Sequence, residues 1–264
     1  MPATTGEIAK ARETPPAIAL PPFTFAFQPI VDMSTGAIFS YEALVRGPAN
    51  ESASFVLGSI GADAMPYFDG QARLVAIELA ARLGIGCHLN LNVLPRSLHE
   101  GDAPLRATAE AAEHCGIPLS RIVLEVLEND LIKDQGRFAQ IINRYRALGM
   151  TIAIDDFGAG YSGLNLLADF QPDKVKIDML LVRGIASRGP RQAIVRAIIQ
   201  VCLDLGIDVL AEGVETVDEY HWFRDEGVLF YQGYLFAKPG FECLPGFRDP
   251  GYEVEIPDPV RPAA

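Results

Sequence analysis

Short apolar runs that resemble β-strands alternate with helical patterns through most of this 264-residue sequence, and this alternation constrains the fold more than any other feature. Strands separated by helices imply parallel strands joined by crossover connections. About eight strands in roughly 230 residues match a (β/α)₈ barrel better than an open doubly wound sheet. We predict strands at residues 25–32, 38–45, 87–93, 122–128, 151–157, 174–179, 207–212 and 229–235.

The first two predicted strands depart from this alternation. Only residues 33–37, with Ser34-Thr35-Gly36 at their centre, lie between them. Such a short connection joins antiparallel neighbours, because parallel strands need a crossover of a dozen or more residues. The expected fold class is therefore α/β, a modified (β/α)₈ TIM-like barrel with an antiparallel first strand.

Residues 191–205 give the clearest helical pattern, and Gly206 is well placed to end that helix. We expect its apolar stripe to pack in the core through Ile194, Ile198, Val201, Cys202 and Leu205.

Both ends of the sequence differ in composition from its middle. Residues 1–22 contain five prolines among small and charged residues, and residues 257–264 are similar. We expect a flexible N-terminal arm or linker remnant at 1–22, a barrel domain at 23–256 and a flexible tail at 257–264.

The formal net charge of −12 argues against a long nucleic acid as partner, because duplex binding needs clustered Lys and Arg. A small phosphate ligand stays compatible with this charge if metal ions offset the acidic field. The four cysteines form no CxxC pair, which favours reduced thiols over disulfides or a zinc site. The sequence shows neither a signal peptide nor an apolar run long enough to span a bilayer. We therefore expect a cytoplasmic protein without a membrane partner.

Oxygen-bearing side chains recur at the ends of the predicted strands. In a barrel of this kind the carboxyl ends of the strands converge, so these side chains would gather and repel one another. A divalent cation would resolve that repulsion, and carboxylates with an Asn carbonyl favour Mg²⁺ or Mn²⁺ over zinc. The four histidines form no ligand-like pair. The residues in this pattern are Glu42, Asn92, Glu125, Asp155, Asp156 and Glu212.

The adjacent acids Asp155 and Asp156 need a local change of direction. Neighbouring strand residues point to opposite faces, so both reach one site only where the strand ends. Gly158 and Gly160 follow at once and allow that turn. Such a pair suits two metal ions about 3.5–4 Å apart, with one Asp bridging them. The alternative is that one of the two caps the following helix.

Strand alternation places Glu42, Leu44 and Arg46 on one face. A metal ligand, an apolar contact and a cation would then line one wall. Arg46 could hold a phosphate oxygen there.

Lys174, Lys176 and Asp178 also share a face of an otherwise apolar run. A lysine in such a run is usually salt-bridged or extends to solvent. Because acids end the neighbouring strands, we interpret Lys176 as a site residue that stabilises the attacking water or the developing phosphorane charge.

These residues belong to a set of motifs that resembles one known family. Between about residues 25 and 239 the sequence is similar to the EAL-domain cyclic di-GMP phosphodiesterases, which cleave the cyclic dinucleotide to linear pGpG on a modified (β/α)₈ barrel. The matching segments are Phe27-Gln28-Pro29-Ile30-Val31, Glu42-Ala43-Leu44-Val45-Arg46, Leu91-Asn92-Val93, Leu124-Glu125 with Glu128, Asp155-Asp156-Phe157-Gly158-Ala159-Gly160-Tyr161-Ser162, Lys176-Ile177-Asp178, Ala211-Glu212-Gly213-Val214-Glu215-Thr216 and Gln232-Gly233-Tyr234-Leu235-Phe236.

The resemblance implies a role for each matching residue. It implies two metal ions, the first held by Glu42, Asn92, Glu125 and Asp155. The second would be held by Asp155, Asp156 and Glu212. The implied catalytic residues are Lys176 beside the nucleophilic water, Glu212, and Glu128, which steadies the loop after Asp156. Contacts to the dinucleotide or its phosphate are implied for Gln28, Leu44, Arg46, Asp178 and Gln232.

The sequence departs from the family pattern at two positions. Leu127 stands where the family usually has Thr, and Gly47 replaces a common Trp. Neither removes a ligand, but Leu127 could alter how the loop with Asp155 and Asp156 is held. The sequence around Glu42 and at residues 163–168 looks closest to the branch of the family found downstream of photoreceptor modules. The resemblance also implies a homodimer.

Three functions therefore stand as hypotheses. The first is hydrolysis of cyclic di-GMP with Mg²⁺ or Mn²⁺. The second is a catalytically inactive cyclic di-GMP receptor that signals through a protein partner. The third is an unrelated barrel enzyme that uses Mg²⁺ to stabilise an enolate, since such enzymes also place acids at strand ends.

Overall fold

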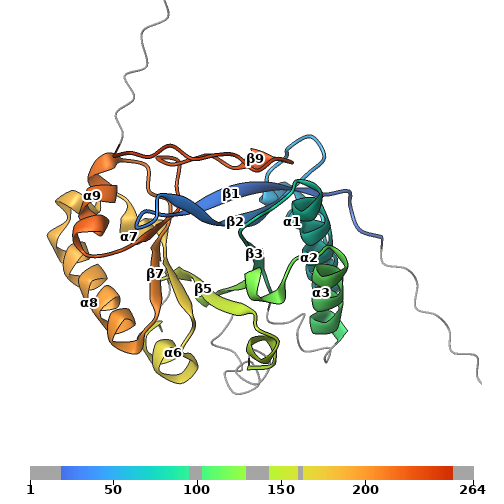
Figure 1. The fold of residues 1–264 in the computed structure, drawn as a ribbon, viewed down its shortest axis with the longest axis horizontal. Coiled ribbons are helices and arrows are strands. Elements are labelled where there is room, and N and C mark those ends of the chain that lie inside the picture. The colour runs from blue at the N-terminus through green and yellow to red at the C-terminus, as the bar shows by residue number, and fades with distance from the viewer. Residues whose placement is uncertain (1–18, 95–102, 129–142, 160–162, 252–264) are drawn as a thin grey trace, which may run out of the picture.

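In the computed structural model, which describes residues 19–94, 103–128, 143–159 and 163–251, the strands form a closed barrel (Figure 1). Around the described barrel the strand order is β2-β3-β4-β5-β6-β7-β8-β1, and pairing of β1 with β2 closes the ring. The strands are β1 (Thr24–Asp32), β2 (Ala37–Arg46), β3 (His88–Asn92), β4 (Ile122–Leu127), β5 (Thr151–Phe157), β6 (Lys174–Ile177), β7 (Asp208–Ala211), β8 (Phe230–Tyr231) and β9 (Gly240–Phe241), which pairs with β1 outside the ring.

Helices surround the barrel. In Figure 1, α1, α2 and α3 cover the side of β3, whereas α8 and α9 cover the side of β7. None of the helices in the described ranges combines the length and apolar character needed to cross a lipid bilayer. They are α1 (Ala53–Gly58), α2 (Met65–Arg82), α3 (Ala103–His114), α6 (Gly163–Phe170), α7 (Met179–Val182), α8 (Gly189–Leu205) and α9 (Val217–Asp225), with short 3₁₀ turns at Leu119–Arg121 and Ile185–Ser187.

The first two strands form the antiparallel hairpin that the sequence predicts. Their register runs from Thr24 opposite Arg46 to Asp32 opposite Ala37. β1 is also antiparallel to β8, while every described pair from β2 through β8 is parallel. The expected barrel with an irregular first strand is confirmed.

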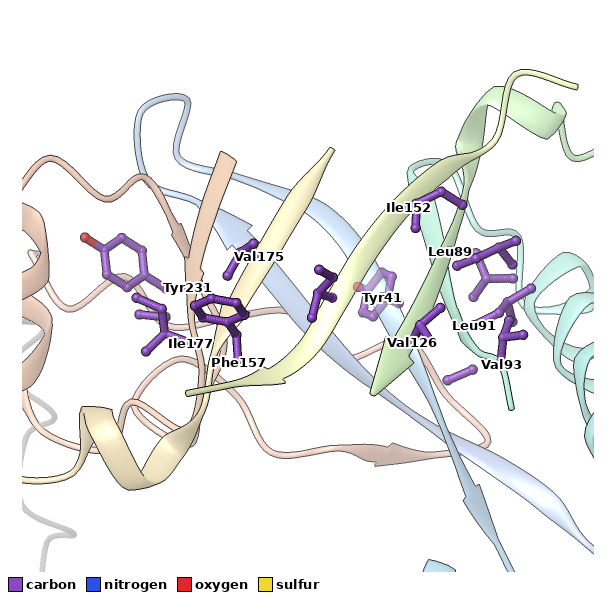
Figure 2. Close-up of a cluster of buried hydrophobic side chains, with 14 of the residues drawn as sticks. Tyr41, Leu89, Leu91, Val93, Val126, Ile152, Phe157, Val175, Ile177 and Tyr231 are labelled. Carbon is purple, nitrogen blue, oxygen red and sulfur yellow. The ribbon is translucent and has the colours of Figure 1, made fainter. Parts of the chain in front are cut away.

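The largest part of the core lies between the barrel strands and the helices (Figure 2). Residues such as Leu89, Leu91, Ile152 and Val175 are buried on one face of their strands. Strands covered on both faces read as nearly continuous apolar runs, which is why the strand positions are visible in the sequence.

The predicted stripe of α8 is wrong in part. Gly206 does end this helix, in the left-handed conformation (φ 71°). Ile194 and Leu205, however, are exposed, and the buried residues are Val195, Ile198 and Cys202. Positions 195, 198 and 202 share a helix face that includes the predicted Ile198 and Cys202, so the buried face is shifted towards Val195 relative to the prediction.

Two predicted strands run two or more residues past the observed carboxyl end of the strand. β6 stops at Ile177 because Asp178 caps α7, where its carboxylate accepts the Leu180 N–H at 2.7 Å. β8 covers only Phe230 and Tyr231, so Gln232 lies beyond the strand.

At the amino ends of the strands, the Lys174 ammonium packs over two aromatic rings. The Lys174 ammonium lies 4.5 Å from the ring centre of Phe39 and 4.4 Å from that of Phe230, and 2.5 Å from the Asp208 carboxylate. Phe39 stacks in turn on His88. Lys174 therefore lies at the end of the barrel opposite to the predicted site.

Candidate active site

Acidic side chains from four strand ends meet at the carboxyl end of the barrel. Glu42 comes from β2, Glu125 from β4, Asp155 and Asp156 from β5, and Glu212 follows β7. One ligand oxygen from each of Glu42, Glu125 and Asp155 lies within 4.8 Å of the other two, and Asp155, Asp156 and Glu212 form a second such group. Asp155 is common to both groups.

The backbone of Asp156 explains how two adjacent acids reach one place. Asp156 has a left-handed conformation (φ 54°), and the pairing of β5 with β6 shifts register between Ile154 and Phe157. This irregularity interrupts the alternation of side chains before the strand ends. The sequence argument attributed the turn to Gly158 and Gly160. In the structure Asp156 itself makes it, and Gly160 lies outside the described residues.

The Lys176 ammonium lies at the centre of the acids. Its Nζ is 2.5 Å from a carboxylate oxygen of Glu212, 2.9 Å from Glu125, 2.9 Å from Asp155 and 3.4 Å from Glu42. Only 1% of the Lys176 side chain is exposed. Burial opposes its charge, but the four carboxylates outweigh burial and raise the pKa of Lys176 well above its ordinary value.

Burial has the opposite effect on the acids. It raises the pKa of Glu125 well above its usual range, and Glu42 adds to the shift while Lys176 opposes it. Burial, with Asp155 next, raises the pKa of Glu212 well above its usual range. For Asp156, burial and the charge of Asp155 raise the pKa to about 6. The positive charge of Lys176 is therefore too small to stabilise the ionised forms of all these acids.

Amide side chains complete the lining of the site. Gln232 Nε2 donates to Glu42 at 2.7 Å and lies 3.4 Å from Gln28 Oε1, and Gln28 Nε2 donates to the Ala237 carbonyl at 3.1 Å. Asn92 is exposed, and its Nδ2 is 3.3 Å from Glu42. The residues predicted as metal ligands or substrate contacts in β1, β2, β3 and the segment after β8, namely Gln28, Glu42, Asn92 and Gln232, thus lie in one site.

The sequence argument missed Asn90. This residue is buried, and its Nδ2 donates to Glu125 at 2.7 Å. Asn90 and Asn92 are two positions apart in β3 and therefore share a face of the strand. A polar residue two positions before the predicted ligand was thus the sequence signal that could have identified Asn90.

Three other predicted residues have specific local partners. Glu128 accepts the Gly158 N–H at 2.9 Å and so contacts the turn after Asp156. Asp178 lies beside Asp156, whose pKa it helps to raise, and its carboxylate caps α7. Arg46 donates to the Val45 carbonyl at 2.8 Å.

Leu44 and Leu127 line a cavity of about 440 Å³ between β2, α1 and α2, together with Glu42 and Asn92. Leu127 in β4 pairs in register with Asp155 in β5. This departure from the family pattern therefore lies beside the strand that carries Asp155 and Asp156. Leu127 does not displace any of the candidate acids from the site.

The acidic groups fit a divalent cation. Glu125 Oε2 is buried and has no hydrogen-bond partner among the described residues, which is rare for a carboxylate oxygen and suits a metal ligand. All donors in the two groups are carboxylate oxygens, the type that Mg²⁺ and Mn²⁺ prefer.

Comparison with known proteins identifies the family. The family model described as "EAL domain" matches residues 11–239. The blue light- and temperature-regulated antirepressor BluF of Escherichia coli is 36% identical over 228 residues, which are 86% of this chain and 56% of the relative. The cyclic di-GMP phosphodiesterase PA2567 of Pseudomonas aeruginosa is 34% identical over 226 residues, 82% of this chain and 38% of the relative. This chain therefore spans about half the length, or less, of these curated relatives.

Among solved structures, a standalone versatile EAL protein from Vibrio cholerae O395 in its c-di-GMP-bound form superposes with a TM-score of 0.82 and 46% identity. The match covers 86% of this chain and 95% of that one. The sequence comparison and the structure comparison thus both point to EAL proteins.

Proposed function

This chain belongs to the EAL domain family, and we propose on that basis that it hydrolyses cyclic di-GMP to linear pGpG with two bound Mg²⁺ or Mn²⁺ ions. A relative named as a cyclic di-GMP phosphodiesterase and a similar structure with c-di-GMP bound support this activity and substrate. Membership of the family argues against an enolate-forming barrel enzyme.

The observation that carries the proposal is the balance of charge in the site. The two groups contain five carboxylates, and among the described side chains Lys176 brings one ammonium into them, which leaves four negative charges when all are ionised. Two divalent cations would supply the matching positive charge. Asp155 belongs to both groups of acids and is the candidate bridging ligand, as in sites with two metals about 3.5–4 Å apart.

The cations would polarise the phosphodiester and lower the pKa of a bound water. The attacking water would lose a proton as its oxygen forms a bond to phosphorus, the bond from phosphorus to the 3′ oxygen would break, and that oxygen would take up a proton. Lys176 is positioned to donate hydrogen bonds to the developing charge. Glu42 and Asn92 hold one end of the cluster, and Glu128 fixes the turn at Gly158 that carries Asp156 into the site.

We propose the same residue roles that the resemblance implies, together with a cytoplasmic homodimer in which residues 23–256 form the catalytic barrel. The free state of all four cysteines is compatible with a reducing compartment.

The test is incubation of the purified protein with cyclic di-GMP and Mg²⁺ or Mn²⁺, followed by chromatography for pGpG. Glu42→Ala and Asp155→Asn are expected to abolish turnover while the protein stays folded. Glu78→Gln, an exposed acid on α2, is the matched control and should retain full activity. Binding of cyclic di-GMP without turnover in any divalent metal would instead support the inactive receptor.

A further inference from the structure

The amide side chain of Asn90 is buried inside the barrel, directly below the acid cluster. Asn90 is 2% exposed. Its neighbours in β3, Leu89 and Leu91, belong to the core between the strands and the helices (Figure 2). Because neighbouring strand residues face opposite sides, the Asn90 side chain lies on the inner face of the barrel. An amide buried there needs hydrogen bonds, since an unpaired polar group is costly.

The Asn90 amide finds its partner in the next strand. Asn90 Nδ2 donates to Glu125 Oε1 at 2.7 Å. An ionised carboxylate oxygen only accepts hydrogen bonds, so the NH₂ group of the amide must face it and not the carbonyl. A hydrogen bond to a charged acceptor is stronger than one between neutral groups. The chemistry of the two groups therefore fixes the orientation of both.

The two oxygens of Glu125 differ in their surroundings as a result. Oε1 accepts from Asn90 and also lies 2.9 Å from the Lys176 ammonium. Oε2 is buried, and no donor reaches it within the part of the chain that the structure describes. Turning the carboxylate out of this plane would break the hydrogen bond on Oε1. Oε2 therefore keeps its capacity to bind a cation.

The second asparagine of β3 contacts a different acid. Asn92 Nδ2 lies 3.3 Å from Glu42, and Asn92 is exposed. Water can replace a hydrogen-bond partner of Asn92, whereas Asn90 is shut away from solvent. The bond to Glu125 is the only side-chain hydrogen bond that Asn90 makes in the described ranges, where its Oδ1 has no partner. The two amides therefore differ: Asn92 is a candidate ligand, and Asn90 supports one.

From these contacts we propose that Asn90 is a positioning residue for the metal site, which holds the Glu125 carboxylate in the orientation that leaves Oε2 for a divalent cation. The inference rests on the proposed function, in which Glu125 is a ligand of the first ion. Asn90 acts through Glu125 and is not itself a ligand. Replacing the outer hydrogen-bond partner of a metal ligand typically costs about 10- to 100-fold in metal affinity or activity.

The test measures Mn²⁺ affinity without substrate, by isothermal titration calorimetry at a temperature where circular dichroism shows each variant to be folded. Asn90→Leu keeps about the same side-chain size and removes the donor. Asn90→Ala removes the donor without adding a branched carbon, and serves if the Leu variant does not fold. Either variant should bind Mn²⁺ at least about tenfold more weakly than the wild type. The Mn²⁺ concentration that gives half the maximal rate should rise by the same factor, whereas KM for cyclic di-GMP at saturating Mn²⁺ should stay at its wild-type value.

Ser40→Ala is the matched control. Ser40 in β2 is also fully buried, and its Oγ has no hydrogen-bond partner among the described residues. The substitution therefore changes a polar side chain inside the protein without removing a contact to an acid. Its Mn²⁺ affinity should stay within about twofold of the wild type, as for a change that leaves the outer partners of the ligands intact.

Each outcome decides a separate question. If the wild-type protein hydrolyses cyclic di-GMP and the folded Asn90 variants bind Mn²⁺ as tightly as it does, the positioning inference is wrong and the proposed function stands. An equal loss of affinity in Ser40→Ala also overturns the inference, because the effect would then come from a general loosening of the interior. If the wild-type protein binds Mn²⁺ without turnover and the Asn90 variants weaken that binding, positioning is supported and the enzyme proposal fails. A wild-type protein that binds no divalent cation overturns both.

Discussion

Replacing Lys176 with Met removes the only positive charge among the side chains that the structure places within the acid cluster. The side chain is 1% exposed and contacts four carboxylates at 2.5–3.4 Å. Removing one partner of a buried ion pair destabilises a protein by about 3–5 kcal/mol, because the other charge stays buried. Protons already bind readily to Glu125 and Glu212, whose pKa values are raised, so they replace part of the lost charge. We therefore expect the lower end, about 3 kcal/mol at neutral pH.

A loss of that size corresponds to a fall in melting temperature of about 6–12 °C for a domain of this size. Differential scanning calorimetry in EDTA measures it, and Lys238→Met, which removes an exposed lysine, should melt within about 2 °C of the wild type. Adding Mn²⁺ should raise the melting temperature of Lys176→Met by more than that of the wild type, because the ions supply the missing charge without competing with an ammonium. If the variant melts with the wild type in EDTA, or if Mn²⁺ shifts both equally, the counter-charge argument fails.

Three further predictions concern pH, the loop after β5 and the far end of the barrel. Because the pKa of Asp156 rises to about 6 on folding from an ordinary value of 3.8, its contribution to metal-free stability is present at low pH and lost as pH rises through about 6. Asp156→Asn should remove that component from melting curves recorded between pH 4.5 and 7.5, and an unchanged slope would contradict it. Glu128→Ala leaves the Gly158 N–H without this acceptor and should lower kcat at least tenfold, at a stability cost of about 1–3 kcal/mol. Wild-type kcat would show that Glu128 is dispensable. Lys174→Met should lower stability by about 1–2 kcal/mol through its lost contacts with two rings and an acid, while KM and kcat stay at wild-type values. A change in KM would place Lys174 in the active site after all.

Strand positions and candidate ligands could be predicted because each depends on a local pattern. A run such as Ile-Val-Leu-Glu-Val-Leu at 122–127 shows an apolar strand with one acid in it, and its buried acid is Glu125. The parallel barrel brings such acids together without further information, because the carboxyl ends of its strands converge. The antiparallel hairpin followed from the short connection alone.

The features that could not be predicted depend on contacts between distant segments. The left-handed backbone of Asp156 is set by how β5 pairs with β6. The rotation of α8 depends on the strands it packs against, since positions 194 and 195 are both apolar in the sequence. Lys174 and Lys176 share a strand face and look alike in sequence. Only the barrel separates them, one at its amino end against Phe39 and one among the acids.

The reversed direction of β1 also determines where the polypeptide enters the barrel. Thr24 lies opposite Arg46, the last residue of β2, so β1 begins at the end where the acids gather and runs away from it. Just before it, Phe23 packs on Phe68 of α2, beside the cavity lined by Leu44. In a barrel made only of parallel strands, the incoming segment would reach the opposite face. Here the segment that leads into Thr24 continues directly into the hairpin that carries Gln28 and Glu42, so it joins the strands of the site without crossing the core.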